Sequence, residues 1–167
     1  MRLTKAKAIL SRIEDVSRGE EEMNLSQLDL EAFPPECLHY LHIKSLLLNS
    51  NKIQVIPQEI GRLTELRELC IERNNLVSLP HTISLLKNLD RFHAHSNELS
   101  SIPVEFGALS NLTRLFLSCN RLTSLPSEIG LLTNLVWISL DRNRLTSLPP
   151  EVSPSFLHLP SIHELDH

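Results

Sequence analysis

A repeat of 23 residues dominates the amino-acid sequence and limits the folds that the chain can adopt. Asparagine recurs at this spacing, and proline recurs in the same register. The asparagines are Asn51, Asn74, Asn97, Asn120 and Asn143, and the prolines are Pro57, Pro80, Pro103, Pro126 and Pro149. A fixed period of this length is the signature of a solenoid, in which each repeat buries its apolar side chains only against its neighbours.

Each repeat contains one LxxLxL segment, in which apolar and other residues alternate. A period of two indicates a short strand with one buried face, and parallel strands need a crossover connection between them. We therefore predict an α/β repeat solenoid, an arc with one parallel sheet of about six short strands on its concave face. The fourth and sixth residues of the regular units should form the inner wall of the core, namely Leu46/Leu48, Leu69/Ile71, Phe92/Ala94, Leu115/Leu117 and Ile138/Leu140.

Asparagine, proline and glycine recur at fixed places in the repeat, and each is expected to have a structural role. Asparagine at the ninth place can hydrogen-bond backbone groups where the chain turns away from the strand. The recurring proline fixes φ at the start of the outer segment. Glycine residues are expected to provide a turn on the convex side, at Gly61, Gly107 and Gly130.

The repeats divide the chain into three parts. A solenoid exposes an apolar cross-section at each end and needs caps. Residues 1–19 should form an N-terminal capping helix, because apolar residues between positions 4 and 18 follow helical spacing; a helix that binds a membrane surface or calmodulin is the alternative. Residues 20–152 form the solenoid, with one degenerate unit before five regular ones. Residues 153–167 either cap the last repeat or are a truncated or divergent end.

The repeat resembles the leucine-rich repeat superfamily, and more narrowly its 23-residue LPxxIGxLxNL type. The segment LPSEIGLLTNL, from Leu125 to Leu135, follows that motif almost letter for letter. This type is similar to intracellular scaffolds that bind Ras-like small GTPases and to the repeats of Scribble and Erbin. The resemblance implies a protein partner such as a small GTPase or its regulatory complex, although the motif residues themselves only build the solenoid.

The strand residues that point away from the core should carry the function, because packing does not dictate their identity. The first half of this face is acidic, and the second half combines arginines with a phenylalanine and the single tryptophan. Tryptophan and arginine are enriched in binding hot spots. The alternative is that Phe116 and Trp137 only pack on each other across adjacent strands. The predicted partner-binding residues are Arg91, His93, His95, Arg114, Phe116, Trp137, Asp141 and Arg142.

Four side chains on two neighbouring strands are possible zinc ligands. Cys70 and Glu72 should lie beside His93 and His95, and thiolate, carboxylate and imidazole groups all bind zinc. Side chains on neighbouring strands of a flat sheet, however, fan outward in parallel and do not meet at one point. We therefore predict no metal site and no cofactor, and interpret these residues as polar contacts for a partner.

Composition excludes several other functions. Lysine and arginine number 16 against 20 aspartate and glutamate, so the net charge of −4 provides no basic field for nucleic acid. The three cysteines form neither a disulfide framework nor a CxxC pair, which favours reduced, intracellular thiols. No secretory signal, transmembrane run, nucleotide-binding glycine loop or catalytic constellation is found in the sequence.

These observations together predict a cytoplasmic, monomeric, non-catalytic interaction module with no membrane insertion. A signalling scaffold or adaptor that binds a protein on its concave face fits them. The alternative is a substrate-recognition arm of an enzyme system, such as a ubiquitin ligase or an effector.

Overall fold

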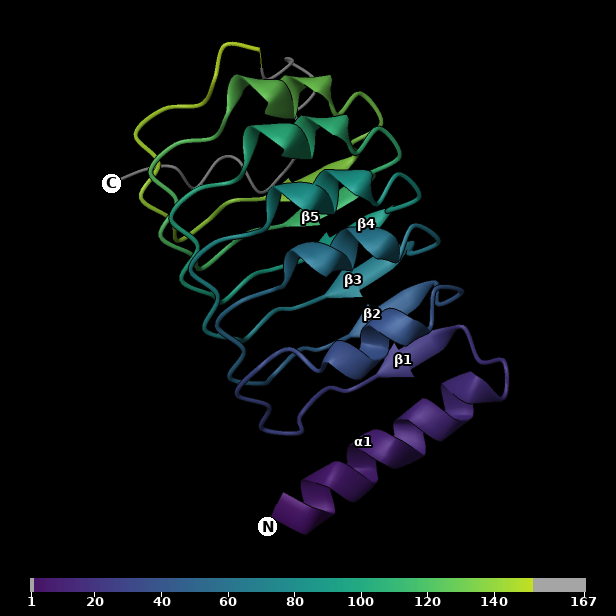
Figure 1. The fold of residues 1–167 in the computed structure, drawn as a ribbon. Helices are drawn as coiled ribbons and strands as arrows, with labels where there is room; N and C mark the ends of the chain where they lie inside the picture. Colours follow the sequence, from purple (N-terminus) through teal and green to yellow (C-terminus); the bar gives the residue numbers. More distant parts are fainter. Residues whose placement is uncertain (1, 152–167) are drawn as a thin grey trace.

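A computed structural model describes residues 2–151 of the chain as a stack of repeats with two layers. Parallel strands form one layer and 3₁₀ helices the other, while helix α1 (Arg2–Ser17) lies across the end of the stack next to β1 (Figure 1). The six-stranded sheet follows chain order, which confirms the predicted solenoid. Its strands are β1 (Glu22–Asn24), β2 (Ser45–Leu47), β3 (Glu68–Cys70), β4 (Arg91–His93), β5 (Arg114–Phe116) and β6 (Trp137–Ser139).

Neighbouring strands pair at the spacing of the sequence repeat. Leu46 of β2 pairs with Leu69 of β3, which in turn pairs with Phe92 of β4. All fourth-place and sixth-place side chains are buried, as predicted. In one repeat a large and a small residue share this space, because Phe92 stands beside Ala94 and packs edge-to-face on Phe106 with ring centroids 5.4 Å apart.

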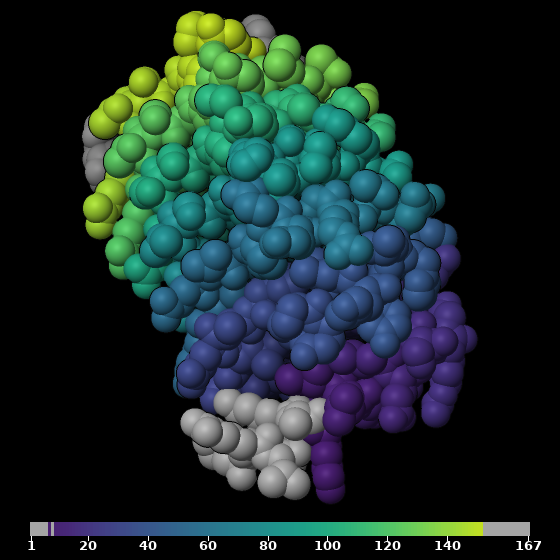
Figure 2. All heavy atoms as spheres, viewed as in Figure 1, coloured from purple at the N-terminus to yellow at the C-terminus, as the bar shows by residue number. Residues whose placement is uncertain are grey.

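Between residues 2 and 151 the outer layer consists of five short 3₁₀ helices, and successive repeats cover this side of the molecule in chain order (Figure 2). Helices η2 to η5 each begin directly after the repeat proline, whose φ of −63° to −71° suits this entry. Ile60, Ile83, Phe106 and Ile129 from these helices close the core. The helices are η1 (Pro35–His39), η2 (Gln58–Arg62), η3 (His81–Leu85), η4 (Val104–Ala108) and η5 (Ser127–Leu131).

The outer-layer glycines do not provide a turn, so that prediction was wrong. Gly61, Gly107 and Gly130 lie inside 3₁₀ helices, and none has a positive φ. A Cβ at Gly107 would come within 2.3 Å of the carbonyl oxygen of Glu128 in the next repeat. These glycines therefore allow the outer segments of neighbouring repeats to approach each other closely.

The first repeat lacks this glycine, and its outer helix η1 packs less closely against the next outer helix, η2. Leu38 stands at the corresponding place, where η3 has the small residue Ser84. Helices η1 and η2 pack against each other less closely than helices η2, η3, η4 and η5 pack against one another. An apolar hollow between them is lined by residues that include Phe33, Leu38 and Val55. Leu38 thus occupies the place at which glycine allows later repeats to approach each other closely.

The repeat asparagines join each repeat to the one before it, which confirms their structural role. Asn97 donates from Nδ2 to the carbonyl oxygens of Ala94 in its own repeat (3.2 Å) and Ile71 in the preceding one (3.0 Å). Its Oδ1 accepts a hydrogen bond from the Leu76 amide at 3.0 Å. The same pattern recurs at Asn51, Asn74, Asn120 and Asn143.

The residue before each asparagine adopts a left-handed conformation, although no glycine marks this place. Ser96, for example, has a φ of 57°, and its amide donates to the Ser118 carbonyl of the next repeat at 2.9 Å. This inter-repeat bond helps to hold a backbone conformation that is uncommon for such residues. The residues at this place are Ser50, Arg73, Ser96, Cys119 and Arg142, and in the first repeat Gln27 and Asp29 also have a positive φ.

Helix α1 covers the first repeat, as predicted. Val16 is fully buried and Ile9 packs against the core, while Leu10 is 58% exposed. Among residues 2–151, no helix combines the length and the apolar character that crossing a bilayer requires. The tail at residues 153–167, predicted as a cap or a divergent end, lies outside the described residues.

We predict that Asn97→Ala lowers the free energy of unfolding by about 3 kcal/mol, because buried backbone groups on two repeats lose their hydrogen-bond partner. Asn88→Ala is the matched control, since Asn88 is exposed and makes a single 2.9 Å bond to the Thr64 carbonyl. It should cost about 0.5 kcal/mol or less. Urea titrations of both variants test this, and equal losses would contradict the structural role of the asparagines.

The capping helix gives a second prediction. Val16→Ala should lower the free energy of unfolding by about 1.5 kcal/mol, because two buried methyl groups are lost. Leu10→Ala should change it by about 0.5 kcal/mol or less. Alanine favours helix at both positions, so a loss confined to Val16→Ala reports packing on the first repeat. Thermal or urea melts with no difference between the variants would reject the capping contact.

Candidate functional site

Strands β4, β5 and β6 bring most of the predicted binding residues together on one face. Arg91 pairs in register with Arg114, which pairs with Trp137, and His93 pairs with Phe116. All five side chains are at least partly exposed. We use the term concave face for the third-place and fifth-place residues of β1–β6 together with the seventh-place residue that follows each strand.

The remaining predicted residues lie just past the strands. His95 and Asp141 occupy seventh places and are half-buried, and His95 Nδ1 lies 3.2 Å from the hydroxyl oxygen of Ser96. Arg142 is exposed and occupies the left-handed turn, with a φ of 54°. These residues extend the concave face toward the turns that contain the repeat asparagines.

Phe116 stacks on His93 and not on Trp137. The ring centroids of His93 and Phe116 are 4.5 Å apart, and the ring planes differ by 17°. Within residues 2–151, no ring contact joins Phe116 to Trp137. The alternative expectation, that these two aromatic residues pack on each other, is therefore wrong, and the indole of Trp137 has no aromatic partner in the described chain.

The acidic and basic halves of the concave face meet between β3 and β4. Arg91 lies 3.6 Å from Glu68 and 3.8 Å from Asp90, so its charge is largely compensated. Arg114 and Arg142 are exposed and form no ion pair with any residue that the structure describes. In the half of the face that β4–β6 form, these two arginines are therefore available to a partner.

Several buried polar atoms on this face have no hydrogen-bond partner within the protein. Buried polar groups in folded proteins are normally paired, so each exception needs an explanation. For the described residues, every such side-chain atom belongs to the concave face and none to the core or the outer layer. The atoms are Ser45 Oγ, Glu72 Oε2, Arg91 Nε, His93 Nε2, Trp137 Nε1 and Ser139 Oγ.

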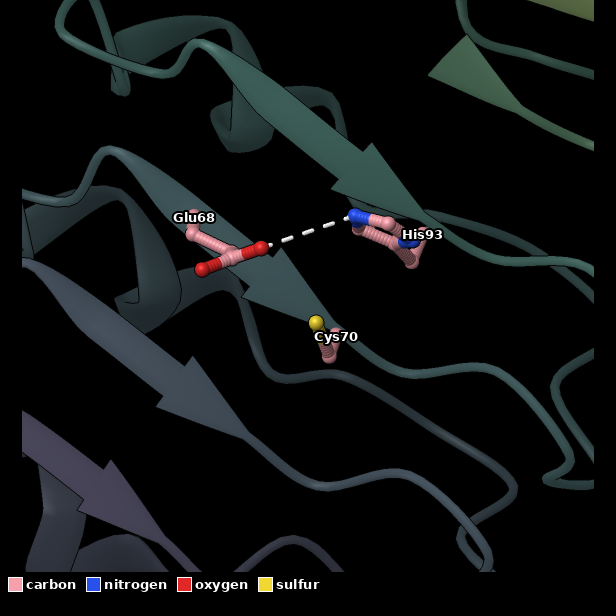
Figure 3. A group of neighbouring side chains, drawn as sticks. All are labelled: Glu68, Cys70 and His93. Carbon is pink, nitrogen blue, oxygen red and sulfur yellow. Dashed lines mark ion pairs between the residues drawn. The ribbon is translucent and has the colours of Figure 1, made fainter. Parts of the chain in front are cut away.

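Glu68, Cys70 and His93 converge, which corrects the expectation that side chains on neighbouring strands fan apart (Figure 3). One ligand atom from each lies within 4.8 Å of the others, and Glu68 Oε1 is 3.6 Å from His93 Nε2. The carboxylate involved is Glu68 and not the expected Glu72. Glu68 occupies a third place and His93 a fifth place, and diagonal neighbours of this kind are within reach of long side chains.

Burial shifts the protonation equilibria of two of these groups. Burial raises the pKa of the Cys70 thiol to about 12, and the carboxylates of Glu72 and Glu68 add to this effect. Burial also lowers the pKa of His93, against the opposing influence of the same two carboxylates. In the metal-free protein near neutral pH, the thiol is therefore protonated and the imidazole is neutral.

The cysteine environments predict a clear order of alkylation. Cys37 and Cys70 are buried, and burial raises the pKa of each to about 12, so both have a negligible thiolate fraction at neutral pH. Cys119 is partly exposed. Iodoacetamide should therefore label Cys119 first in the native protein, whereas the urea-unfolded control should be labelled at all three sites. Peptide mass spectrometry measures the order, and early labelling of Cys70 would contradict it.

A family model described as leucine rich repeat matches the sequence at residues 95–145 and 110–166. A comparison with curated proteins gave no match. Solved structures give a consistent result. A leucine-rich repeat protein from Leptospira interrogans is 32% identical with a TM-score of 0.74, and the alignment covers 88% of this chain and 42% of that one.

Two further structures show the same fold. One is the leucine-rich repeat ectodomain of the plant membrane receptor kinase GASSHO1/SCHENGEN3 from Arabidopsis thaliana, solved in complex with Casparian strip integrity factor 2. It is 31% identical with a TM-score of 0.67, and the alignment covers 72% of this chain and 15% of that one. The leucine-rich effector protein YopM from Yersinia pestis is 26% identical with a TM-score of 0.71, covering 89% and 39%. The chain thus spans less than half the length of each of these three structures.

Proposed function

The chain belongs to the leucine-rich repeat family, and we propose that it is a non-catalytic interaction module that holds a protein partner on its concave face. The observation that carries this proposal is the confinement of the unpaired buried polar atoms of the described residues to that face. Leaving such a group unpaired costs about 1–3 kcal/mol. Five of the six residues are partly exposed, so small side-chain rotations would let donors and acceptors on a partner pair these atoms.

The proposed contact centre lies on β4 to β6. Trp137 and the stacked pair of His93 and Phe116 provide the aromatic area that is typical of hot spots. The stack also fixes the Phe116 ring before a partner arrives, which reduces the entropy lost on binding. Further proposed contacts around this centre are Arg91, His95, Arg114, Asp141 and Arg142.

The partner should present an acidic patch. Arg114 and Arg142 have no ion pair in the described chain, so their charges can attract carboxylates and speed association. A small GTPase or its regulatory complex is the partner class that the LPxxIGxLxNL resemblance implies. We assign the chain a role as a monomeric signalling scaffold or adaptor in the cytoplasm, and its three free cysteines support a reducing compartment.

A recognition arm within a larger system is the second candidate. The observation that favours it is that one of the similar structures is an effector protein. In that case the concave face would bind a substrate for a catalytic part elsewhere. Both candidates use the same surface, and they differ in whether the captured protein is chemically modified.

The proposal predicts that Trp137→Ala weakens partner binding by about 2 kcal/mol, roughly a 30-fold rise in Kd. Its free energy of unfolding should change by about 1 kcal/mol or less. Leu131→Ala is the control, because Leu131 lies on η5 in the outer layer and is 62% exposed. Crosslinking of the intact chain followed by mass spectrometry identifies the partner, and calorimetric titration of the purified pair gives the affinities.

Salt dependence provides a second measurement on the same pair. Arg114→Ala should reduce the slope of log Kd against salt concentration, because one charge pair is lost. If Leu131→Ala weakens binding while Trp137→Ala does not, the outer layer is the binding surface and the proposal fails.

A further inference from the structure

We propose that Glu68, Cys70 and His93 bind a zinc ion on the concave face. Together they offer a carboxylate oxygen, a sulfur and an imidazole nitrogen, a set that zinc accepts. Calcium and magnesium prefer oxygen ligands alone, so a site with sulfur and nitrogen favours a transition metal ion. The proposal concerns the chain by itself and is independent of the proposed partner.

The distances leave room for an ion between the three groups. Zinc bonds to these atom types are about 2.0–2.3 Å long, which places neighbouring ligand atoms of a tetrahedral site about 3.3–3.7 Å apart. Glu68 Oε1 and His93 Nε2 are already 3.6 Å apart, and all three ligand atoms lie within 4.8 Å of one another. A movement of about 1 Å, within reach of side-chain rotation, would complete the geometry.

The neighbours of two ligands hold them in the required orientation. The flat stack on Phe116 fixes the His93 ring, and its Nε2 is buried without a hydrogen-bond partner and is directed toward Glu68 (Figure 3). Glu68 uses its other oxygen, Oε2, for the 3.6 Å contact with Arg91. Glu68 Oε1 is therefore available without breaking that ion pair, and such outer contacts commonly orient metal ligands.

Binding would convert the Cys70 thiol to a thiolate, with its proton released to solvent. Three protein ligands leave a fourth position for water or for a side chain of another molecule, as in zinc sites that keep an open position. Because Cys70 and His93 lie on adjacent strands, the ion would link β3 to β4. The metal should therefore stabilise the folded chain as well as bind to it.

The test uses cobalt(II) as a spectroscopic probe of the whole chain, purified without a histidine tag. Thiolate coordination gives a sulfur-to-cobalt charge-transfer band, which zinc should abolish when it replaces cobalt. We expect this band in the native chain and in Cys119→Ser, which retains Cys70. We expect its loss in Cys70→Ser, and at least a tenfold rise in the cobalt Kd for His93→Gln and for Glu68→Gln.

Thermal melts with and without zinc separate loss of the site from loss of the fold. Zinc should raise the Tm of the native chain but not that of His93→Gln, and both metal-free proteins should melt cooperatively. Absence of the band at saturating cobalt, or its loss in Cys119→Ser with retention in Cys70→Ser, would overturn the proposal. An unchanged cobalt affinity in both His93→Gln and Glu68→Gln would do the same. These measurements include no partner, so their failure would leave the proposed interaction function untouched.

Discussion

Hydrogen bonds from one asparagine side chain per repeat are the interaction on which the rest of the molecule depends. Each strand has only three residues, so the sheet alone makes few backbone bonds between neighbours. Each asparagine adds bonds to its own repeat and to the preceding one, and all but Asn143 do so at a buried position where water cannot replace them. A shift of register would leave these amides unpaired. The bonds therefore fix the 23-residue register, which places the third-place and fifth-place residues of each repeat on one face.

That register separates packing from recognition. The side chains at the fourth and sixth places are buried in the core. The third, fifth and seventh places contain all the buried polar side-chain atoms of the described residues that lack a hydrogen-bond partner. Polar groups without a partner therefore accumulate where they do not disturb the core. The ion pair of Arg91 with Glu68 shows that the face also satisfies part of its own charge, while Arg114 and Arg142 remain available beside β4–β6.

The sequence period was sufficient to predict the solenoid, the buried columns and the neighbours of each surface residue, because all of these follow from register. The direction of a surface side chain does not follow from register. The Phe116 ring stacks on His93, and the Glu68 carboxylate contacts His93 diagonally. The rotamer of each side chain depends on the side chains of both adjacent strands, which the period does not specify. The role of Gly107 was missed for a related reason, since the close approach of Glu128 is a property of packed repeats.

The place of Leu38 has a consequence for the curvature of the stack. The first and second repeats are joined on the strand side by the pairing of β1 with β2, but on the outer side η1 and η2 stand apart. This interface is therefore closed along one edge and open along the other. Outer-layer packing constrains the angle between the first two repeats less than the angles between the later ones, so it determines the curvature of the concave face least at this end.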